Sequence, residues 1–346
     1  MKTMVLLEVA LAVAASAANY SARQDTRDGV DVVVLADSAR HTEVTILPSI
    51  GNMAYRMKVN GKDALNAPAG DDLAKFKASP GRTGIPVLWP WANRLDQASY
   101  YVNGKLYALN LGLGNISADR NKKPVHGMLR TSSAWKVVSC KADGQAAEVT
   151  SRLEFWKYPD LMDQFPFAHT IELTYRLKDG MLQVETVLRN LGAEPMPVAI
   201  GFHSFYRVND APPDQWTIHL GARDHVTLSP DGLPTGERTS VQSKYADPLP
   251  LKGVRFDDVF TNMIRDAKGL GEFWIQGKTE KVSVIYGPKY DVATVMAGDG
   301  DFAVMETMSA IPNAFNLAHR GVYKDLQMVA PDGEWRESFW VKPSGF

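Results

Sequence analysis

Apolar and polar residues alternate along most of the chain, and glycine-containing turns separate the alternating runs. The clearest example is residues 169–190, where every second residue from Ile171 to Leu177 is apolar or aromatic. Asp179-Gly180 follows, and the alternation resumes at Leu182. Two alternating runs joined by Asp-Gly or Asn-Gly are a strong hairpin signal. Asn-Gly at 60–61 and at 103–104 therefore predicts two further hairpins.

Short alternating runs continue to the end of the chain, at 272–277, 281–287, 291–298, 301–308 and 337–343. Helical periodicity is scarce, and only residues 71–79, DDLAKFKAS, predict a short helix. Long antiparallel strands with one buried face pack as two layers. We predict an all-β fold, a large antiparallel β-sandwich formed by residues 19–346 as one domain.

Composition is ordinary for a globular protein with a substantial core: 346 residues, 45% hydrophobic and 22% charged. The formal net charge of −1 gives no basic surface for nucleic acid, so we expect no nucleic-acid partner. We expect no membrane insertion, and a monomer or weak homodimer. The single cysteine, Cys140, excludes an intrachain disulfide and is expected to be structural.

The first 18 residues have the pattern of a secretory signal peptide. Lys2 supplies the positive charge, residues 5–14 are mostly apolar, and small residues at 15–18 provide a cleavage site. Glu8 interrupts the apolar run, and a buried N-terminal helix is the alternative interpretation. We expect a secreted or periplasmic protein.

Several signatures of catalysis are missing. The sequence contains no His-Glu-x-x-His zinc helix, nucleophile elbow, phosphate loop or dinucleotide fingerprint. Its seven histidines are spread singly, so the sequence assigns no metal ligands, although a site could assemble in three dimensions. We expect no cofactor.

Three stretches combine polar side chains with aromatic or apolar neighbours. In LWPWANR, Arg94 beside Asn93 could bind vicinal hydroxyls while a tryptophan ring stacks on the apolar face of a sugar. His126 precedes a glycine, which permits close approach of backbone or ligand. His203 lies in AIGFHSFYRV, at the end of an apolar run.

Two further stretches carry acidic groups. Asp257 and Asp258 are adjacent in FDDVFT, and Glu306 interrupts an apolar strand in VMETMSAIPNAFN. A charge in such a strand is costly unless it has a partner or a task.

Each of these residues also has an ordinary structural interpretation. A histidine in a strand is commonly a hydrogen-bonded structural group, and Arg94 could form a surface ion pair. Paired aspartates often cap turns or helices, and Glu306 could face solvent at a strand end.

Taken together and in this order, the motifs resemble those of the aldose 1-epimerases, or galactose mutarotases. The resemblance runs from about residue 44 to the C-terminus and rests on Asn-Arg, His-Gly, the second His with aromatics, Phe-Asp-x-x-Phe, and Glu in a strand with Pro-Asn-Ala-Phe-Asn. It implies the galactose-mutarotase type of β-sandwich. The order Ser204-Phe205-Tyr206 departs from the Tyr-Phe pair that is frequent in the family.

The resemblance implies interconversion of the α and β anomers of free aldohexoses. Glu306 matches the general base at the anomeric hydroxyl, and His203 matches the general acid at the ring oxygen. His126, Arg94 and Asp257 match residues that bind the sugar, and Asn93 joins them as Arg94's neighbour. An acid and a base on opposite sides of one ring can open a hemiacetal without metal or cofactor. We expect protonated His203 and ionised Glu306 in the resting site.

Other functions remain open on the same fold. One is a carbohydrate-binding protein without turnover. Another is a lyase or a glycosidase, which would need a second carboxylate about 5–10 Å from Glu306. A third is a sugar-phosphate mutarotase, for which Arg82, Arg120 and Arg130 are the available arginines.

Overall fold

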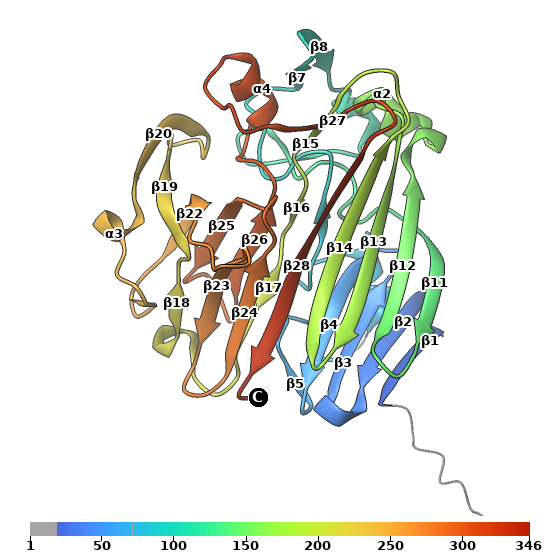
Figure 1. Ribbon diagram of the computed structural model, residues 1–346, viewed down its shortest axis with the longest axis vertical. Helices are drawn as coiled ribbons and strands as arrows, with labels where there is room; N and C mark the ends of the chain where they lie inside the picture. Colours follow the sequence, from blue (N-terminus) through green and yellow to red (C-terminus); the bar gives the residue numbers. More distant parts are fainter. Residues whose placement is uncertain (1–18, 71) are drawn as a thin grey trace, which may run out of the picture.

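Antiparallel β-sheets dominate the computed structural model, which describes residues 19–70 and 72–346 (Figure 1). The predicted signal peptide, residues 1–18, lies outside the described residues. The prediction of a large all-β sandwich is confirmed. No helix among the described residues is long and apolar enough to cross a membrane.

Two large sheets and one smaller sheet form the body of the molecule. In spatial order, the nine-stranded sheet consists of β11 (Lys136–Ala142), β12 (Ala147–Glu154), β13 (His169–Lys178), β14 (Met181–Asn190), β28 (Glu334–Ser344), β24 (Lys281–Tyr286), β23 (Gly271–Gln276), β18 (Thr217–His219) and β21 (Leu249–Pro250). The eight-stranded sheet consists of β20 (Pro234–Ser240), β19 (Ala222–Leu228), β22 (Phe256–Met263), β25 (Val292–Ala297), β26 (Ala303–Met308), β16 (Gly201–Phe202) and β6 (Val87–Leu88), with β17 (Phe205–Tyr206) also paired to β26. The five-stranded sheet consists of β1 (Tyr20–Arg27), β2 (Val30–Asp37), β3 (Thr42–Leu47), β4 (Met53–Val59) and β5 (Lys62–Asp63).

Short elements connect these sheets. Three two-stranded sheets pair β7 (Ser99–Val102) with β8 (Lys105–Ala108), β9 (Ser117–Ala118) with β10 (Pro124–Val125), and β15 (Met196–Val198) with β27 (Gln327–Val329). The α-helices are α1 (Leu73–Ala78), α2 (Pro159–Gln164), α3 (Val241–Lys244) and α4 (Ala314–His319). Short 3-10 helices are η1 (Ser38–Arg40), η2 (Leu111–Leu113), η3 (Phe155–Lys157) and η4 (Pro213–Gln215).

The sequence pattern placed several of these elements correctly. The three predicted hairpins are β4–β5, β7–β8 and β13–β14, with positive φ at both turn residues of each. The residues that alternate in β13 are buried on one face, as the period of two requires. The short helix predicted over 71–79 is α1. By contrast, the Pro-Asn-Ala-Phe-Asn segment expected in the strand of Glu306 is a turn followed by α4, because Asn313 has a left-handed φ of 60°.

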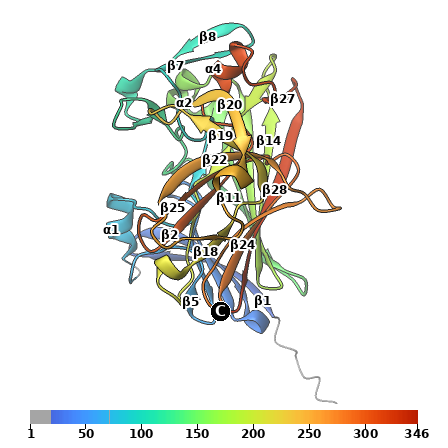
Figure 2. The same ribbon diagram turned by 90° about the vertical axis from the view of Figure 1, so that its left-hand side faces the viewer.

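The two large sheets lie against each other as layers (Figure 2). Aromatic side chains form part of the core between them. Phe202 of the eight-stranded sheet contacts Phe339 of β28, with ring centroids 4.8 Å apart. Tyr290 contacts both rings. This packing leaves the opposite face of the eight-stranded sheet to the loops and to solvent.

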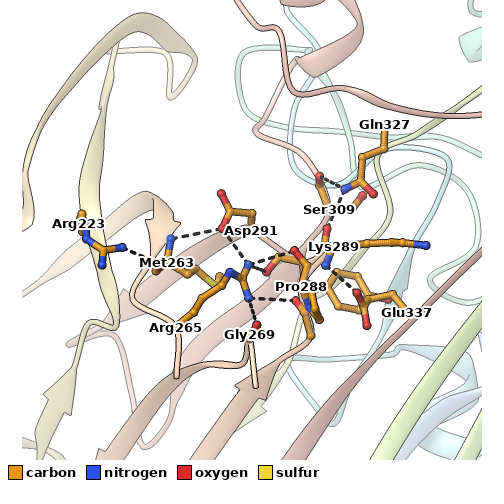
Figure 3. Close-up of polar contacts among 12 residues, drawn as sticks. Arg223, Met263, Arg265, Gly269, Pro288, Lys289, Asp291, Ser309, Gln327 and Glu337 are labelled. Atoms are coloured by element: carbon orange, nitrogen blue, oxygen red, sulfur yellow. Dashed lines mark hydrogen bonds and ion pairs between the residues drawn. The ribbon is translucent and has the colours of Figure 1, made fainter. Parts of the chain in front are cut away.

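A polar network fixes the connections around the central strands (Figure 3). The guanidinium of Arg265 donates to four backbone carbonyl oxygens and to Asp291. The Gln327 amide then bridges the carbonyl oxygens of Lys289 and Ser309. Because Lys289 precedes β25 and Ser309 follows β26, the network holds these neighbouring strands at adjacent ends.

At Gly127 the backbone of another segment, at Trp89, comes very close. The φ of Gly127 is +61°, and a Cβ there would lie 2.1 Å from the carbonyl oxygen of Trp89. Gly104 has a similar φ of +75°, but a Cβ there would meet nothing within 4 Å. The sequence suggested that this glycine permits close approach of backbone or ligand. The structure shows a close approach of the Trp89 backbone.

We predict that Gly127→Ala destabilises the protein by about 1–3 kcal/mol more than Gly104→Ala, because the backbone must move to admit the methyl group. Both variants share the left-handed strain of an L residue, so their difference isolates the steric clash. Urea unfolding of both variants measures it. Equal midpoint shifts would contradict the proposed close contact.

Candidate functional site

A histidine and a glutamate face each other across two neighbouring strands. Phe202 pairs with Thr307 before this point, and Phe205 pairs with Val304 after it. The same register places His203 opposite Glu306. The two side chains make direct contact, with His203 Nε2 3.0 Å from Glu306 Oε1. The register of these strands thus positions both groups.

Side-chain alternation places this pair on the outer face of the eight-stranded sheet. Phe202 points inward to the core, so His203 points outward, and Phe205 follows on the same outer face. The Phe205 ring stacks on the imidazole of His203 at a centroid distance of 4.6 Å. Tyr206 is fully buried on the opposite side. The order Ser204-Phe205-Tyr206 therefore still leaves an aromatic ring beside the imidazole.

A second histidine, His126, lies beside His203 although it comes from a different part of the chain. Its backbone has a left-handed φ of 65°, and its backbone N–H donates to the carbonyl oxygen of Asn93 at 2.8 Å. This backbone geometry brings its ring edge-on to His203, with centroids 5.0 Å apart. Both imidazoles are therefore next to Glu306.

Arg94 is held in place by two neighbours. Its Nε donates to Asp119 Oδ2 at 2.9 Å, and its Nη1 donates to Asn93 Oδ1 at 3.0 Å. Its own carbonyl oxygen accepts from the backbone N–H of Asn313 at 2.8 Å. Arg94 does form an ion pair, with Asp119, as the structural interpretation suggested. The pair orients the Arg94 guanidinium, which lines a cavity.

That cavity has a volume of about 430 Å³ and contains both Arg94 and Asp257 in its lining. Thr294, which is the register partner of Glu306, also lines it. Loop residues 119–121 and 230–232 form the outer wall. The volume is within the usual range for small-molecule sites, about 300–1,000 Å³.

The two adjacent aspartates point in opposite directions from β22. Asp257 lines the cavity and is exposed. Asp258 instead accepts from Lys244 Nζ at 2.8 Å and from the hydroxyl of Tyr245, and lies 3.3 Å from His225 Nε2. The preference for Asp257 as the candidate site residue agrees with this placement, and Asp258 is a structural group.

Burial controls the protonation of the central pair. Burial raises the pKa of Glu306 well above its usual range, and the nearby Asp257 carboxylate adds to the shift. Burial also lowers the pKa of His203 to about 4 and holds that of His126 well below its usual range. Burial thus favours the neutral forms of both groups, which is opposite to the protonated His203 and ionised Glu306 expected from the sequence.

The tryptophans do not have the role that the sequence suggested. Trp89 is fully buried and donates from its indole N–H to His169 Nε2 at 3.0 Å, and Trp91 is also buried. Neither ring is available to stack on a ligand. Among the aromatic residues that follow His203 in the sequence, Phe205 lies beside the His203 imidazole.

Three donor residues could hold a cation. One ligand atom each from His126, His203 and Glu306 lie within 4.8 Å of one another, and within the described ranges no other such set of three is found. No sequence motif indicated this set, because its members are far apart along the chain.

The sequence also did not indicate the residues that position Arg94 and connect the loops around the cavity. Asp119 orients Arg94, and the ion pair of Lys123 with Asp231 at 3.0 Å links the two loops of the outer wall. Their surrounding sequence is an ordinary polar loop. Only the fold shows that these residues lie beside the cavity.

Comparison with known proteins agrees with the fold and its motifs. The sequence model of the family described as aldose 1-epimerase matches residues 34–338. A protein of Escherichia coli (strain K12) described as uncharacterized protein YihR is 24% identical over 237 residues, which is 66% of this chain and 71% of that protein.

Solved structures share the fold at low sequence identity. A galactose mutarotase-like protein from Clostridium acetobutylicum has a TM-score of 0.83 and 21% identity, covering 95% of this chain and 99% of that chain. The galactose 1-epimerase of Lactobacillus acidophilus NCFM has a TM-score of 0.72 and 11% identity, covering 95% and 100% of the two chains.

We predict that the His203 imidazole stays neutral in the unliganded protein from pH 8 down to about pH 5. The sign follows from burial, which disfavours the imidazolium and so moves its protonation toward more acidic pH. Nitrogen NMR of ¹⁵N-histidine-labelled protein measures this, with His203→Gln to assign the signal. An imidazolium signal from His203 at pH 7 would show that the ion pair forms instead.

Proposed function

This chain belongs to the aldose 1-epimerase family, and from that premise we propose that it interconverts the α and β anomers of free aldohexoses. The observation that carries the proposal is the direct contact of His203 with Glu306 on the outer face of the sheet, 3.0 Å apart. General acid–base opening of a hemiacetal needs one group to remove a proton and another to supply one.

We assign the base to Glu306 and the acid to His203. In the unliganded site burial favours the neutral pair, in which the carboxyl proton is donated to the imidazole. Transfer of that proton along the existing hydrogen bond gives carboxylate and imidazolium, the reactive form. The number of bound protons does not change, so the conversion needs no exchange with solvent.

The sugar then replaces the direct contact between the two groups. Glu306 accepts the proton of the anomeric hydroxyl, and His203 donates its proton to the ring oxygen. The bond between C1 and the ring oxygen breaks, and an aldehyde forms at C1. Rotation about C1–C2 presents the other carbonyl face. Ring closure reverses both transfers, so the pair returns to its starting state and no external reactant is consumed.

Binding of the remaining hydroxyls is proposed for the cavity beside the pair. Arg94 and Asp257 present a donor and an acceptor to it. His126 is placed to contact the sugar near the ring oxygen, next to His203. Asn93 is buried and its side-chain oxygen accepts from Arg94. We therefore propose that Asn93 positions Arg94 and lets Arg94 contact the sugar.

We also propose export through the N-terminal segment, on the sequence pattern of residues 1–18 alone. N-terminal sequencing of the mature protein from a bacterial host tests it: cleavage after residue 17 or 18 supports export, and an intact N-terminus in the cytosolic fraction contradicts it.

Glu306→Gln is expected to lower kcat for mutarotation by roughly 10²–10⁴-fold, the usual contribution of a positioned acid or base. Polarimetry of fresh α-D-glucose and α-D-galactose measures the rate. Glu280→Gln is the matched control, because Glu280 is also fully buried but pairs with Lys62 instead. Melting temperatures of both variants show whether folding is preserved.

A fully active Glu306→Gln variant would refute the assigned base. Binding of sugar without any acceleration by the wild type would favour a carbohydrate-binding protein. Release of reducing ends from an oligosaccharide would favour a glycosidase, and acceleration confined to hexose 6-phosphates would favour a sugar-phosphate mutarotase.

Asp257→Asn is expected to raise KM more than it lowers kcat, because it removes an acceptor from the binding cavity and leaves the acid–base pair intact. A lost charged hydrogen bond costs about 1.5–3 kcal/mol, or roughly 10- to 150-fold in kcat/KM. Asp258→Asn is the control, since Asp258 bonds to Lys244 and Tyr245 away from the cavity. Equal kinetic losses in both variants would contradict the separate placement of the two carboxylates.

A further inference from the structure

We propose that His126, His203 and Glu306 form a binding site for a zinc-class divalent cation, which excludes the sugar while it is bound. The binding half of this proposal rests on the donor geometry alone. The exclusion half rests on the proposed function, because it requires that the same groups transfer protons to a sugar.

The donor types match those of known zinc sites. Two imidazole nitrogens and one carboxylate oxygen are a donor set that zinc enzymes use, with a fourth position left open. Here one ligand atom from each residue lies within 4.8 Å of the others. Nitrogen and carboxylate donors of this kind favour Zn²⁺, Co²⁺ and Cu²⁺ over Mg²⁺ and Ca²⁺.

The distances require only a small contraction. Bond lengths of about 2.1 Å place two donors on one tetrahedral zinc roughly 3.4 Å apart. His203 Nε2 and Glu306 Oε1 are already 3.0 Å apart. The widest separation must close by roughly 1.4 Å to meet tetrahedral geometry. Rotation about the side-chain bonds of His126 would have to supply this movement.

A buried carboxylate oxygen is available to a cation. Glu306 Oε2 has no hydrogen-bond partner in the described part of the chain, while Glu306 Oε1 contacts His203 Nε2. Metal ligands must be deprotonated, so a bound cation would be held by neutral imidazoles and the Glu306 carboxylate.

The surrounding charges limit the affinity without abolishing it. The guanidinium groups of Arg94, Arg130 and Arg82 disfavour a cation near His203, and only that of Arg94 is paired with Asp119, at 2.9 Å. The Asp257 carboxylate lies close enough to raise the pKa of Glu306 and so favours a cation. Coordination through the Nε2 atoms would leave both Nδ1 atoms without the acceptor that strengthens most metal-bound histidines, since neither has a hydrogen-bond partner in the described part of the chain. Weak, reversible occupation is expected.

An occupied site cannot transfer protons, because His203 and Glu306 would both be coordinated. The cation also occupies the space that the anomeric carbon requires. Zinc should therefore act as an inhibitor that competes with the sugar.

Titration of untagged full-length protein with Co²⁺ tests the binding half. The wild type should develop the visible absorption bands of low-coordinate Co²⁺, which saturate in excess Co²⁺ with one ion bound per chain. Zn²⁺ should remove the bands and Mg²⁺ should not. His126→Gln and Glu306→Gln should each abolish them. His219→Gln should retain them, because it removes only the exposed pair of His219 with Asp247, 2.7 Å apart.

Two results would overturn the assignment: no bands from folded wild-type protein, or bands that survive in His126→Gln and Glu306→Gln but disappear in His219→Gln. The exclusion half is tested by mutarotation at increasing Zn²⁺, with a rise in apparent KM expected and reversal by a chelator. Undiminished mutarotation at cobalt-saturating occupancy would refute exclusion. If the wild type accelerates no mutarotation, the proposed function fails, but the cobalt spectrum still decides the cation site.

Discussion

The structure depends on keeping an imidazole and a buried carboxyl group in contact on two neighbouring strands of one sheet. Isolated charges at this depth are costly, and a buried pair is tolerated when each member satisfies the other. His203 and Glu306 meet this condition at 3.0 Å. Burial raises the pKa of Glu306 and lowers that of His203, so it favours the neutral form of each group.

The rest of the fold closes the inner side of that contact and places a cavity beside its outer side, lined by Thr294, the register partner of Glu306. The core between the large sheets seals the inner face, where Phe202 packs on Phe339. On the outer face Phe205 covers one side of the imidazole, and Arg94 and Asp257 line a polar cavity beside it. Asp119 and Asn93 keep the guanidinium pointed at this cavity. The side chains that line the cavity therefore come from different parts of the chain, with Asp257 on β22 of the sheet and Arg94 in the segment that follows β6.

The strands were predictable because a period of two with Asp-Gly or Asn-Gly turns fits a hairpin and few alternatives, as β13 and β14 show. The candidate residues were predictable from the order of short motifs, and Asp257 was separated from Asp258 by its spacing to Phe260. The protonation of the pair was not predictable, because it depends on how deeply the register buries Glu306, which is 2% exposed. The buried position of Trp89, the helical end of the Pro-Asn-Ala-Phe-Asn segment and the role of Asp119 also depend on tertiary packing.

A crystal structure of the protein with a bound aldohexose tests the central claim most directly. We predict that the anomeric carbon lies between the two groups, with the O1 hydroxyl within hydrogen-bond distance of the Glu306 carboxylate and the ring oxygen within that distance of His203 Nε2. The direct contact between His203 and Glu306 should then be replaced by these two hydrogen bonds. A sugar bound with its anomeric carbon away from both side chains, and their contact intact, would contradict the assigned acid–base pair.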